Sequence, residues 1–128
     1  MPSGFIADVN YATVESGAPG STAPATGPAV CVVDSPPHER YELWVGGDLV
    51  GILGYQRDSA ARSGDVLTLL HTVVREDRGG RGWAAVLVRE VLDRARREGT
   101  RIRPVCTYVR RFLGMHTEYL DLLDEQGV

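Results

Sequence analysis

Glycines are concentrated in one short turn whose surroundings suit an anion. Gly79, Gly80 and Gly82 follow an apolar run, and the turn leads directly into a strongly periodic helical segment. The first amides of a helix have no partner within the helix, and the positive end of the helix dipole lies beside them. Glycine has no Cβ and therefore lets a ligand approach the backbone closely. The pattern predicts a phosphate-binding turn to which Arg78 and Arg81 add positive charge.

Two familiar phosphate-binding motifs do not fit this turn. A P-loop needs a lysine, and all 14 basic residues of this chain are arginines. The run 80–85 matches G-x-G-x-x-A, but a dinucleotide site also needs an acidic residue at the end of the next strand. That strand, expected at 101–106, contains no acidic residue. A dinucleotide site is therefore not expected.

Charge is unevenly distributed around the same turn. Residues 75–111 contain 11 arginines and five acidic residues, although the whole chain has a net charge of −3. A local positive surface fits a polyphosphate ligand. The alternative is that Arg89, Arg94, Arg96 and Arg97 form the solvated face of a helix. The acidic remainder of the chain argues against nucleic acid as a partner.

The elements that position the turn follow from hydrophobic periodicity. Apolar residues recur with helical spacing along 84–95, and Gly99 is placed to end that helix. The run 66–74 is mostly apolar or β-branched, which predicts a central strand covered on both faces. The remaining elements are expected as strands at 30–33, 40–45, 49–55 and 101–106, a polar loop at 56–64 and a helix at 108–115.

Length and composition indicate one small folded domain. The 128 residues suffice for one hydrophobic core. Residues 1–28 are expected to be a disordered tail, because 16–28 contain only Ser, Gly, Ala, Pro and Thr. Residues 29–128 are expected to form an α+β domain with a mixed, mainly antiparallel sheet of about five strands and two or three helices. The composition predicts a cytoplasmic protein without a membrane span, a disulfide framework or a metal cluster.

Two groups of short motifs occur at a characteristic separation. The first is His71-Thr72-Val73-Val74, followed by Gly80-Arg81-Gly82-Trp83-Ala84 and Leu87-Val88. The second is Pro104-Val105-Cys106-Thr107-Tyr108-Val109, followed by His116-Thr117-Glu118-Tyr119. The first group resembles motif A of the GNAT superfamily of acyl-CoA N-acyltransferases. The second resembles the small single-domain branch with a Pro-x-Cys-x-Tyr strand end. Gly79 departs from the family pattern, which has Gln or Arg at that position.

The resemblance covers residues 29–123 and implies a GNAT-like fold with acetyl-CoA as cofactor. It implies transfer of an acetyl group to a primary amine, on a small molecule or a protein, by direct attack. The pantetheine arm would pair with the backbone of Val73 and Val74. The diphosphate would bind the turn and helix start, that is Arg78, Gly79, Gly80, Arg81, Gly82, Trp83 and Ala84. A non-catalytic module that binds CoA or another protein is the alternative, because no residue is an obvious general base.

Three side chains are candidates for catalysis. His71 is a candidate base for the amine, and it is equally a candidate hydrogen-bonded histidine of the core. Tyr108 either protonates the departing thiolate, as a tyrosine does in much of the superfamily, or anchors the last helix through its ring. Cys106 is a proton relay, a transient acyl acceptor or a small apolar filler.

Overall fold

Five strands form one sheet in the order in which they occur along the chain. The computed structural model describes residues 29–59, 64–80 and 82–124, so the predicted tail at 1–28 lies outside the described residues. The strands are β1 (Val30–Ser35), β2 (Arg40–Val45), β3 (Asp48–Asp58), β4 (Val66–Val74) and β5 (Arg101–Pro104). β1 to β4 pair antiparallel, and β5 pairs parallel to β4. This α+β arrangement confirms the predicted fold class.

The helices follow the fourth and fifth strands. α1 (Trp83–Glu98) connects β4 to β5, and α2 (Thr107–Met115) follows β5. Three short 3₁₀ turns complete the elements: η1 (Pro36–His38), η2 (Glu76–Arg78) and η3 (Thr117–Leu122). Gly99 ends α1 at a φ of 72°, as the sequence predicts. No helix in the described part of the chain is long and apolar enough to cross a membrane.

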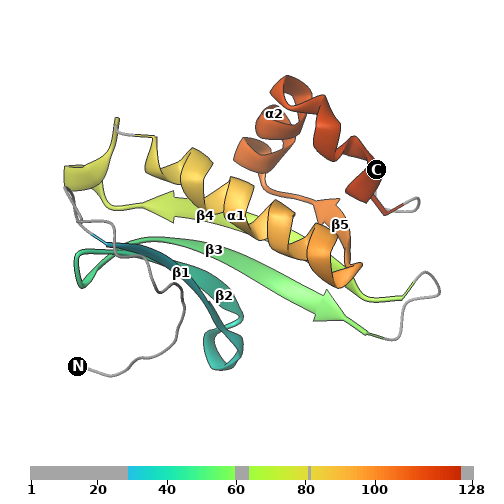
Figure 1. Ribbon diagram of the computed structural model, residues 1–128, viewed down its shortest axis with the longest axis horizontal. Coiled ribbons are helices and arrows are strands. Elements are labelled where there is room, and N and C mark those ends of the chain that lie inside the picture. Colours follow the sequence, from blue (N-terminus) through green and yellow to red (C-terminus); the bar gives the residue numbers. More distant parts are fainter. Residues whose placement is uncertain (1–28, 60–63, 81, 125–128) are drawn as a thin grey trace, which may run out of the picture.

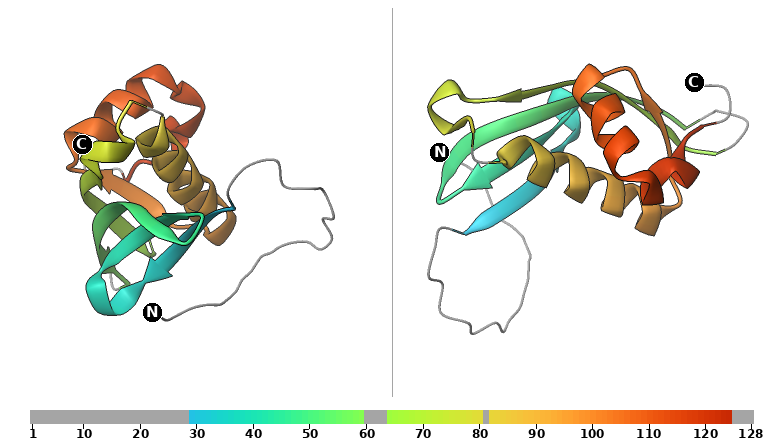
Figure 2. Two further views of the ribbon diagram at one scale, coloured as in Figure 1. Left: turned by 90° about the vertical axis from the view of Figure 1, so that its left-hand side faces the viewer. Right: turned by 90° about the horizontal axis from the view of Figure 1, so that it is seen from above.

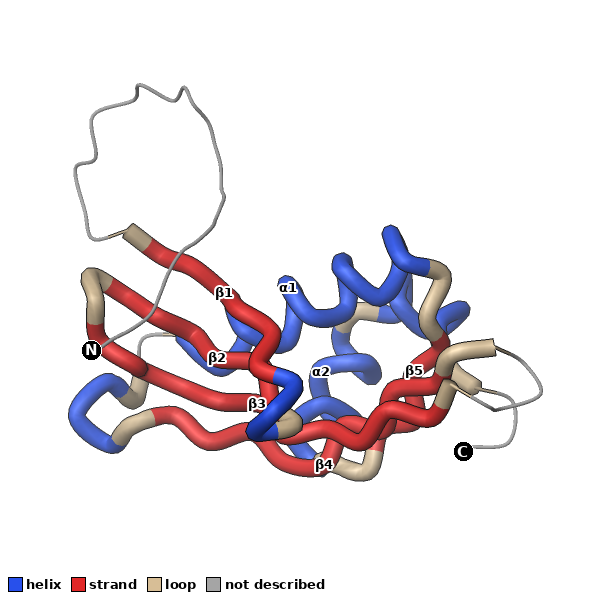
Figure 3. The backbone as a smooth tube through the Cα atoms, turned by 90° about the horizontal axis from the view of Figure 1, so that it is seen from below, coloured by secondary structure: helices blue, strands red, loops and turns tan. Residues whose placement is uncertain are grey.

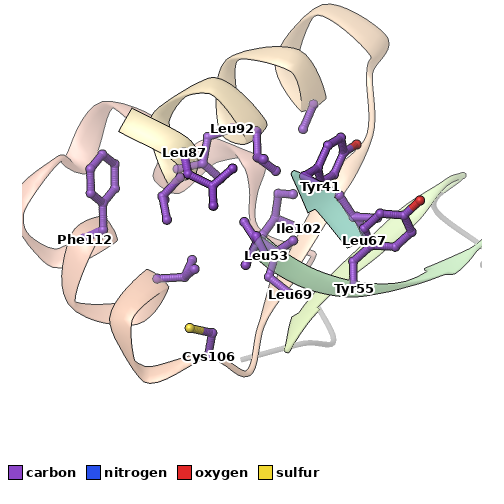
Figure 4. Packing of buried hydrophobic residues seen from close by; sticks show 14 of the residues in the cluster. Tyr41, Leu53, Tyr55, Leu67, Leu69, Leu87, Leu92, Ile102, Cys106 and Phe112 are labelled. Carbon is purple, nitrogen blue, oxygen red and sulfur yellow. The ribbon is translucent and has the colours of Figure 1, made fainter. Parts of the chain in front are cut away.

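Both long helices lie on the same face of the sheet (Figures 1 and 2). The apolar stripe of α1 supplies Leu87 and Leu92, which pack on Leu53, Leu69 and Ile102 of the sheet (Figure 4). All five side chains are fully buried, and burial of such side chains is the main driving force for folding. The helix layer thus fixes where the start of α1 lies relative to β4.

The opposite face of the sheet has no helix over it among the described residues (Figure 3). Strand alternation places Val33, Trp44, Ile52, His71 and Val73 on this face. Val33 and Val73 are exposed, and Trp44 and Ile52 are half-buried. The prediction that 66–74 is covered on both faces is therefore wrong for its second half, where burial alternates from residue to residue.

Several predicted boundaries also differ from the structure, and β1, for example, extends to Ser35 rather than ending at Val33. β3 extends to Asp58, so the first residues of the predicted loop at 56–64 are strand, because β4 continues to pair with them. β5 ends at Pro104 rather than at Cys106, since proline has no N–H to continue the ladder. α2 begins at Thr107, one residue before the predicted start.

A tyrosine side chain connects the edge strand β1 to β3. The hydroxyl of Tyr55 donates a hydrogen bond to Asp34 Oδ1 at 2.6 Å, and the ring packs 5.1 Å from that of Tyr41. Burial and the bond to Asp34 raise the pKa of Tyr55 well above its usual value. The folded state therefore holds this proton more tightly than the unfolded chain does.

We predict that Tyr55→Phe makes the stability of the fold less sensitive to alkaline pH. Unfolded tyrosines ionise near pH ~10. The contribution of Tyr55 is thus complete below that pH and is lost as pH rises toward its folded pKa. Urea denaturation between pH 7 and 11 should show a shallower decline above pH ~10 for the variant, with about 1 kcal/mol lost at neutral pH. An identical decline in both proteins would contradict this assignment.

Candidate active site

The glycine turn before α1 is open. Gly80 and Gly82 both have a φ of 77°, a left-handed conformation that glycine adopts without strain. A Cβ added at either position would meet no atom within 4 Å. Nothing in the described chain therefore fills the concave backbone at these two residues. Arg81, between them, lies outside the described residues.

The start of α1 has no side-chain cap. Gly82 occupies the N-cap position, and the first helical bond runs from Val86 N–H to its carbonyl at 3.1 Å. The amides of Trp83, Ala84 and Ala85 consequently have no acceptor within the helix. The amide of Gly79 differs, because it donates to the Glu76 carbonyl at 3.2 Å within η2. The amides of the helix start are thus available as donors, whereas the amide of Gly79 is not.

Two side chains beside this helix start bear on anion binding. The indole Nε1 of Trp83 is buried and has no hydrogen-bond acceptor among the described residues, and such a donor is costly to leave unpaired. Arg78 is already engaged, because its guanidinium contacts Asp48 Oδ2 at 2.8 Å. Asp48 begins β3, thirty residues earlier in the chain, and the sequence contains no signal that would have paired it with Arg78.

β4 and β5 separate at one point. Their pairing ends at Leu69 and Pro104, and beyond it the carbonyl of Leu69 accepts from the N–H groups of both Val105 and Cys106, each at 2.9 Å. The chain then turns into α2. From residue 70 to residue 74 no strand of the described chain pairs with this edge of β4. The result is a split between the strands that is closed at Leu69.

Backbone polarity determines which groups face the split. Arg75 N–H donates to Val50 of β3, and the Val73 carbonyl also faces β3, 3.1 Å from the position of a Cβ on Gly51. Because backbone groups alternate along a strand, the N–H and C=O of Thr72 and Val74 face the split instead. Thr72, which the sequence analysis did not single out as a site residue, is therefore placed at the split, and Val73 is turned away from it.

Cys106 lies at the closed end of the split, beside Leu69 in the middle of β4, and Tyr108 follows it in the first turn of α2. Cys106 is 6% exposed and is the N-cap residue of α2, at one margin of the core in Figure 4. Its Sγ lies 3.3 Å from the Thr72 hydroxyl. Tyr108, in the first turn of α2, is half-buried and packs against the core. The Cys106 thiol and the backbone donors of β4 thus lie where β4 and β5 part, and Tyr108 follows two residues later.

His71 does not point into the split. Its imidazole is exposed on the uncovered face of the sheet, so the interpretation of His71 as a core histidine is wrong. The ring lies over Gly54, where an added Cβ would be 2.6 Å from Cε1 and 2.7 Å from Nε2. Gly54 belongs to β3, on the side of β4 away from β5. The ring reaches the split only if it rotates off β3.

Most of the helix arginines are paired with acidic groups. Arg94 and Arg97 contact Glu90, Arg96 forms two short contacts with Asp121, and Arg89 donates to the hydroxyl of Tyr119 at 3.5 Å. The positive charge expected for this half of the chain is thus largely compensated locally. These four side chains stabilise the packing of α1 against its neighbours and are not gathered at the glycine turn.

The comparison with protein families identifies this arrangement. The profile of the GCN5-related N-acetyl-transferase family matches residues 40–122, which include the sheet from β2 onward, the glycine turn and both helices. The chain belongs to this family. The GNAT resemblance and the GNAT-like fold expected from the sequence are confirmed. None of the curated proteins matches this GNAT chain.

Two solved structures are similar to this GNAT protein. One is a ribosomal-protein-alanine N-acetyltransferase from Brucella melitensis biovar Abortus 2308, with 18% identity over 70% of this chain and a TM-score of 0.47. The other is Arabidopsis thaliana Naa50 in complex with the bisubstrate analogue CoA-Ac-MVNAL, with 14% identity over 64% of this chain and a TM-score of 0.47. The aligned part spans 65% and 56% of those chains, less than two thirds of either.

We predict that alanine is tolerated better at Gly54 than at Gly51. At Gly54 the new Cβ meets only the end of the His71 side chain, which can rotate away. At Gly51 it meets the Val73 carbonyl at 3.1 Å and Val74 Cγ2 at 3.3 Å, which belong to a paired strand. Thermal or urea unfolding should show a loss below about 1 kcal/mol for Gly54→Ala and about 1–3 kcal/mol for Gly51→Ala.

The same pair of variants tests the position of the imidazole. The ring resonances of His71 should shift in Gly54→Ala and stay in place in Gly51→Ala, as measured by proton NMR. Unchanged His71 resonances in Gly54→Ala would show that the ring does not lie over β3.

Proposed function

We propose that this GNAT protein transfers the acetyl group of acetyl-CoA to a primary amine. The observation that carries the proposal is an open glycine turn at an uncapped helix start, continuous with the half-paired edge of β4. The turn and the helix start can bind an anion, and the edge of β4 that precedes them in the chain can form hydrogen bonds with an extended ligand. The family match supports acetyl transfer in general, and the residues below are our own assignment.

The described residues fit acetyl-CoA. The uncapped amides of Trp83, Ala84 and Ala85 would hold the diphosphate, and Gly80 and Gly82 leave room for it. Arg78 would join these donors by exchanging Asp48 for the diphosphate. Gly79 and Arg81 are assigned to the same site from the sequence alone. Bound acetyl-CoA would supply an acetyl group activated as a thioester.

The edge of β4 would orient the arm of the cofactor. Thr72 and Val74 offer backbone N–H and C=O groups at the split, so an extended chain can pair with them as an added strand. The stretch from residue 70 to residue 74 spans about 13 Å at ~3.3 Å per residue. A thioester held in this way ends beside Leu69 and Cys106, where the split closes.

Direct attack by a neutral amine requires two catalytic contributions from the protein. A backbone N–H at the split stabilises the negative charge that develops on the carbonyl oxygen. Thr72 and Val74 supply such donors, and the amide of Val73 is directed toward β3. The second contribution is a proton for the thiolate that leaves when the C–S bond breaks, and we assign it to the phenol of Tyr108; the tyrosinate then takes up the proton that the amine loses on forming the C–N bond. His71 remains a candidate base only in a rotated conformation, since its ring rests on Gly54.

We predict that Gly82→Glu weakens binding of acetyl-CoA tenfold or more. The new carboxylate enters the open space at the turn, repels the diphosphate and blocks its access. Loss of charge-assisted hydrogen bonds worth about 1.5–3 kcal/mol lowers affinity tenfold or more. The measurement is isothermal titration calorimetry with acetyl-CoA. Equal affinity of wild type and variant would refute the site.

Gly99→Glu is the matched control for this experiment. Gly99 has a φ of 72°, close to the 77° of Gly82, and it also has nothing within 4 Å of an added Cβ. It lies at the opposite end of α1, so it introduces similar backbone strain and the same charge far from the turn. Its affinity for acetyl-CoA should equal that of the wild type.

We predict that Tyr108→Phe lowers kcat about 100-fold without changing KM for acetyl-CoA. The phenylalanine retains the ring that packs against the core and removes only the transferable proton. Steady-state kinetics with a panel of primary amines provides the measurement. An unchanged kcat would leave Tyr108 as an anchor of α2. A wild type that binds acetyl-CoA but acetylates no amine in the panel would instead favour the non-catalytic module.

A further inference from the structure

A hydroxyl and a thiol meet across the closed end of the split. Thr72 Oγ1, on β4, lies 3.3 Å from Cys106 Sγ, at the start of α2. The two residues come from the two segments that part at Leu69, so their contact spans the gap between those segments. No other side-chain hydrogen bond among the described residues joins the second half of β4 to α2.

The contact lies on the helix side of the split. Thr72 pairs with Leu53, and both side chains face the helix layer. Cys106 belongs to the same buried cluster as Leu69 and Val109, which have no exposed surface, and Cys106 itself is 6% exposed. Such a packed interior does not yield to an added group without cost. A group that entered between Thr72 and Cys106 would therefore have to displace packed side chains.

We propose that Thr72 and Cys106 form the wall that limits the length of the acyl group. The inference rests on the proposed function, because it requires the thioester to lie along Thr72 and Val74. An acetyl group at the end of that path has only a methyl group to accommodate. Each further methylene of a longer acyl chain meets the hydroxyl and the thiol, and has to separate them or push Cys106 into Leu69 and Val109.

Thr72 and Cys106 are thus specificity-determining residues for the acyl donor. One methylene too many in a fitted site lowers affinity by about 10-fold or more. Removal of the two side-chain ends takes away the obstacle, while the backbone donors of Thr72 that hold the arm remain. The shortened wall is therefore expected to accept longer chains without losing the site for the diphosphate.

The test is a binding series with acyl-CoA thioesters and no amine present. Isothermal titration calorimetry with acetyl-, butyryl- and hexanoyl-CoA is performed on the full chain and on Thr72→Ala/Cys106→Ala. For the wild type we expect hexanoyl-CoA to bind at least 10-fold more weakly than acetyl-CoA. For the double variant we expect the two affinities to lie within about threefold of each other.

Three control variants separate the wall from other effects. Cys31→Ala removes the other cysteine, on the edge strand β1, and should keep the wild-type selectivity. Thr72→Val removes the hydroxyl and preserves the volume, so it should still exclude hexanoyl-CoA. Cys106→Ser also preserves the volume and should still exclude hexanoyl-CoA. If the double variant does not fold, Cys106→Ala alone is the variant that enlarges the site, and Cys106→Ser is its control. Far-UV circular dichroism verifies each fold.

The outcomes distinguish the proposed function, the limit on acyl length and the assignment of that limit to Thr72 and Cys106. A wild type that binds no acyl-CoA overturns the proposed function itself. A wild type that binds acetyl- and hexanoyl-CoA equally overturns the wall and leaves the proposed function standing. Discrimination that persists in both Thr72→Ala/Cys106→Ala and Cys106→Ala overturns the assignment to these two residues. Relaxed selectivity in the enlarged variants, with wild-type selectivity in Cys31→Ala, supports the proposal.

Discussion

The carbonyl of Leu69 is the point on which the arrangement of the site depends. It accepts hydrogen bonds from the N–H groups of Val105 and Cys106. These residues directly follow Pro104, which has no N–H of its own to donate. The parallel ladder ends there, and the chain leaves the sheet to form α2. Because β5 departs, the rest of β4 keeps one edge unpaired. Without that early departure the edge would be filled by a strand of the protein itself, and no ligand could pair with it.

The single helix layer connects this edge to the anion site. α1 begins at the glycine turn that follows β4, and its buried stripe holds it across the sheet, so the uncapped amides and the unpaired edge keep a fixed relation. α2 packs on the same face and brings Cys106 to the closed end of the split. The chain thus builds its proposed site from one strand, one turn and two helix starts.

Sequence reasoning recovered the parts whose signals are local. The apolar spacing of α1 and the glycines before it were sufficient to predict the helix and the glycine turn at its start. The directions of the side chains along β4 were harder to predict, because the pairing with β3 shifts by one residue at Leu70. The shift lies between the pairs Gly54–His71 and Tyr55–Leu69. One extra residue reverses every later side chain. It turns His71 outward and Thr72 inward, and no pattern within 66–74 reveals it.

The ion pair between Arg78 and Asp48 links the anion site to a distant hairpin. Asp48 closes the turn between β2 and β3, while Arg78 belongs to the turn before α1. Under the proposed function, a negatively charged ligand at that turn would compete with the Asp48 carboxylate for the Arg78 guanidinium. Binding would then release a restraint on the β2–β3 hairpin, and the conformational freedom of this hairpin would depend on whether the proposed site is occupied.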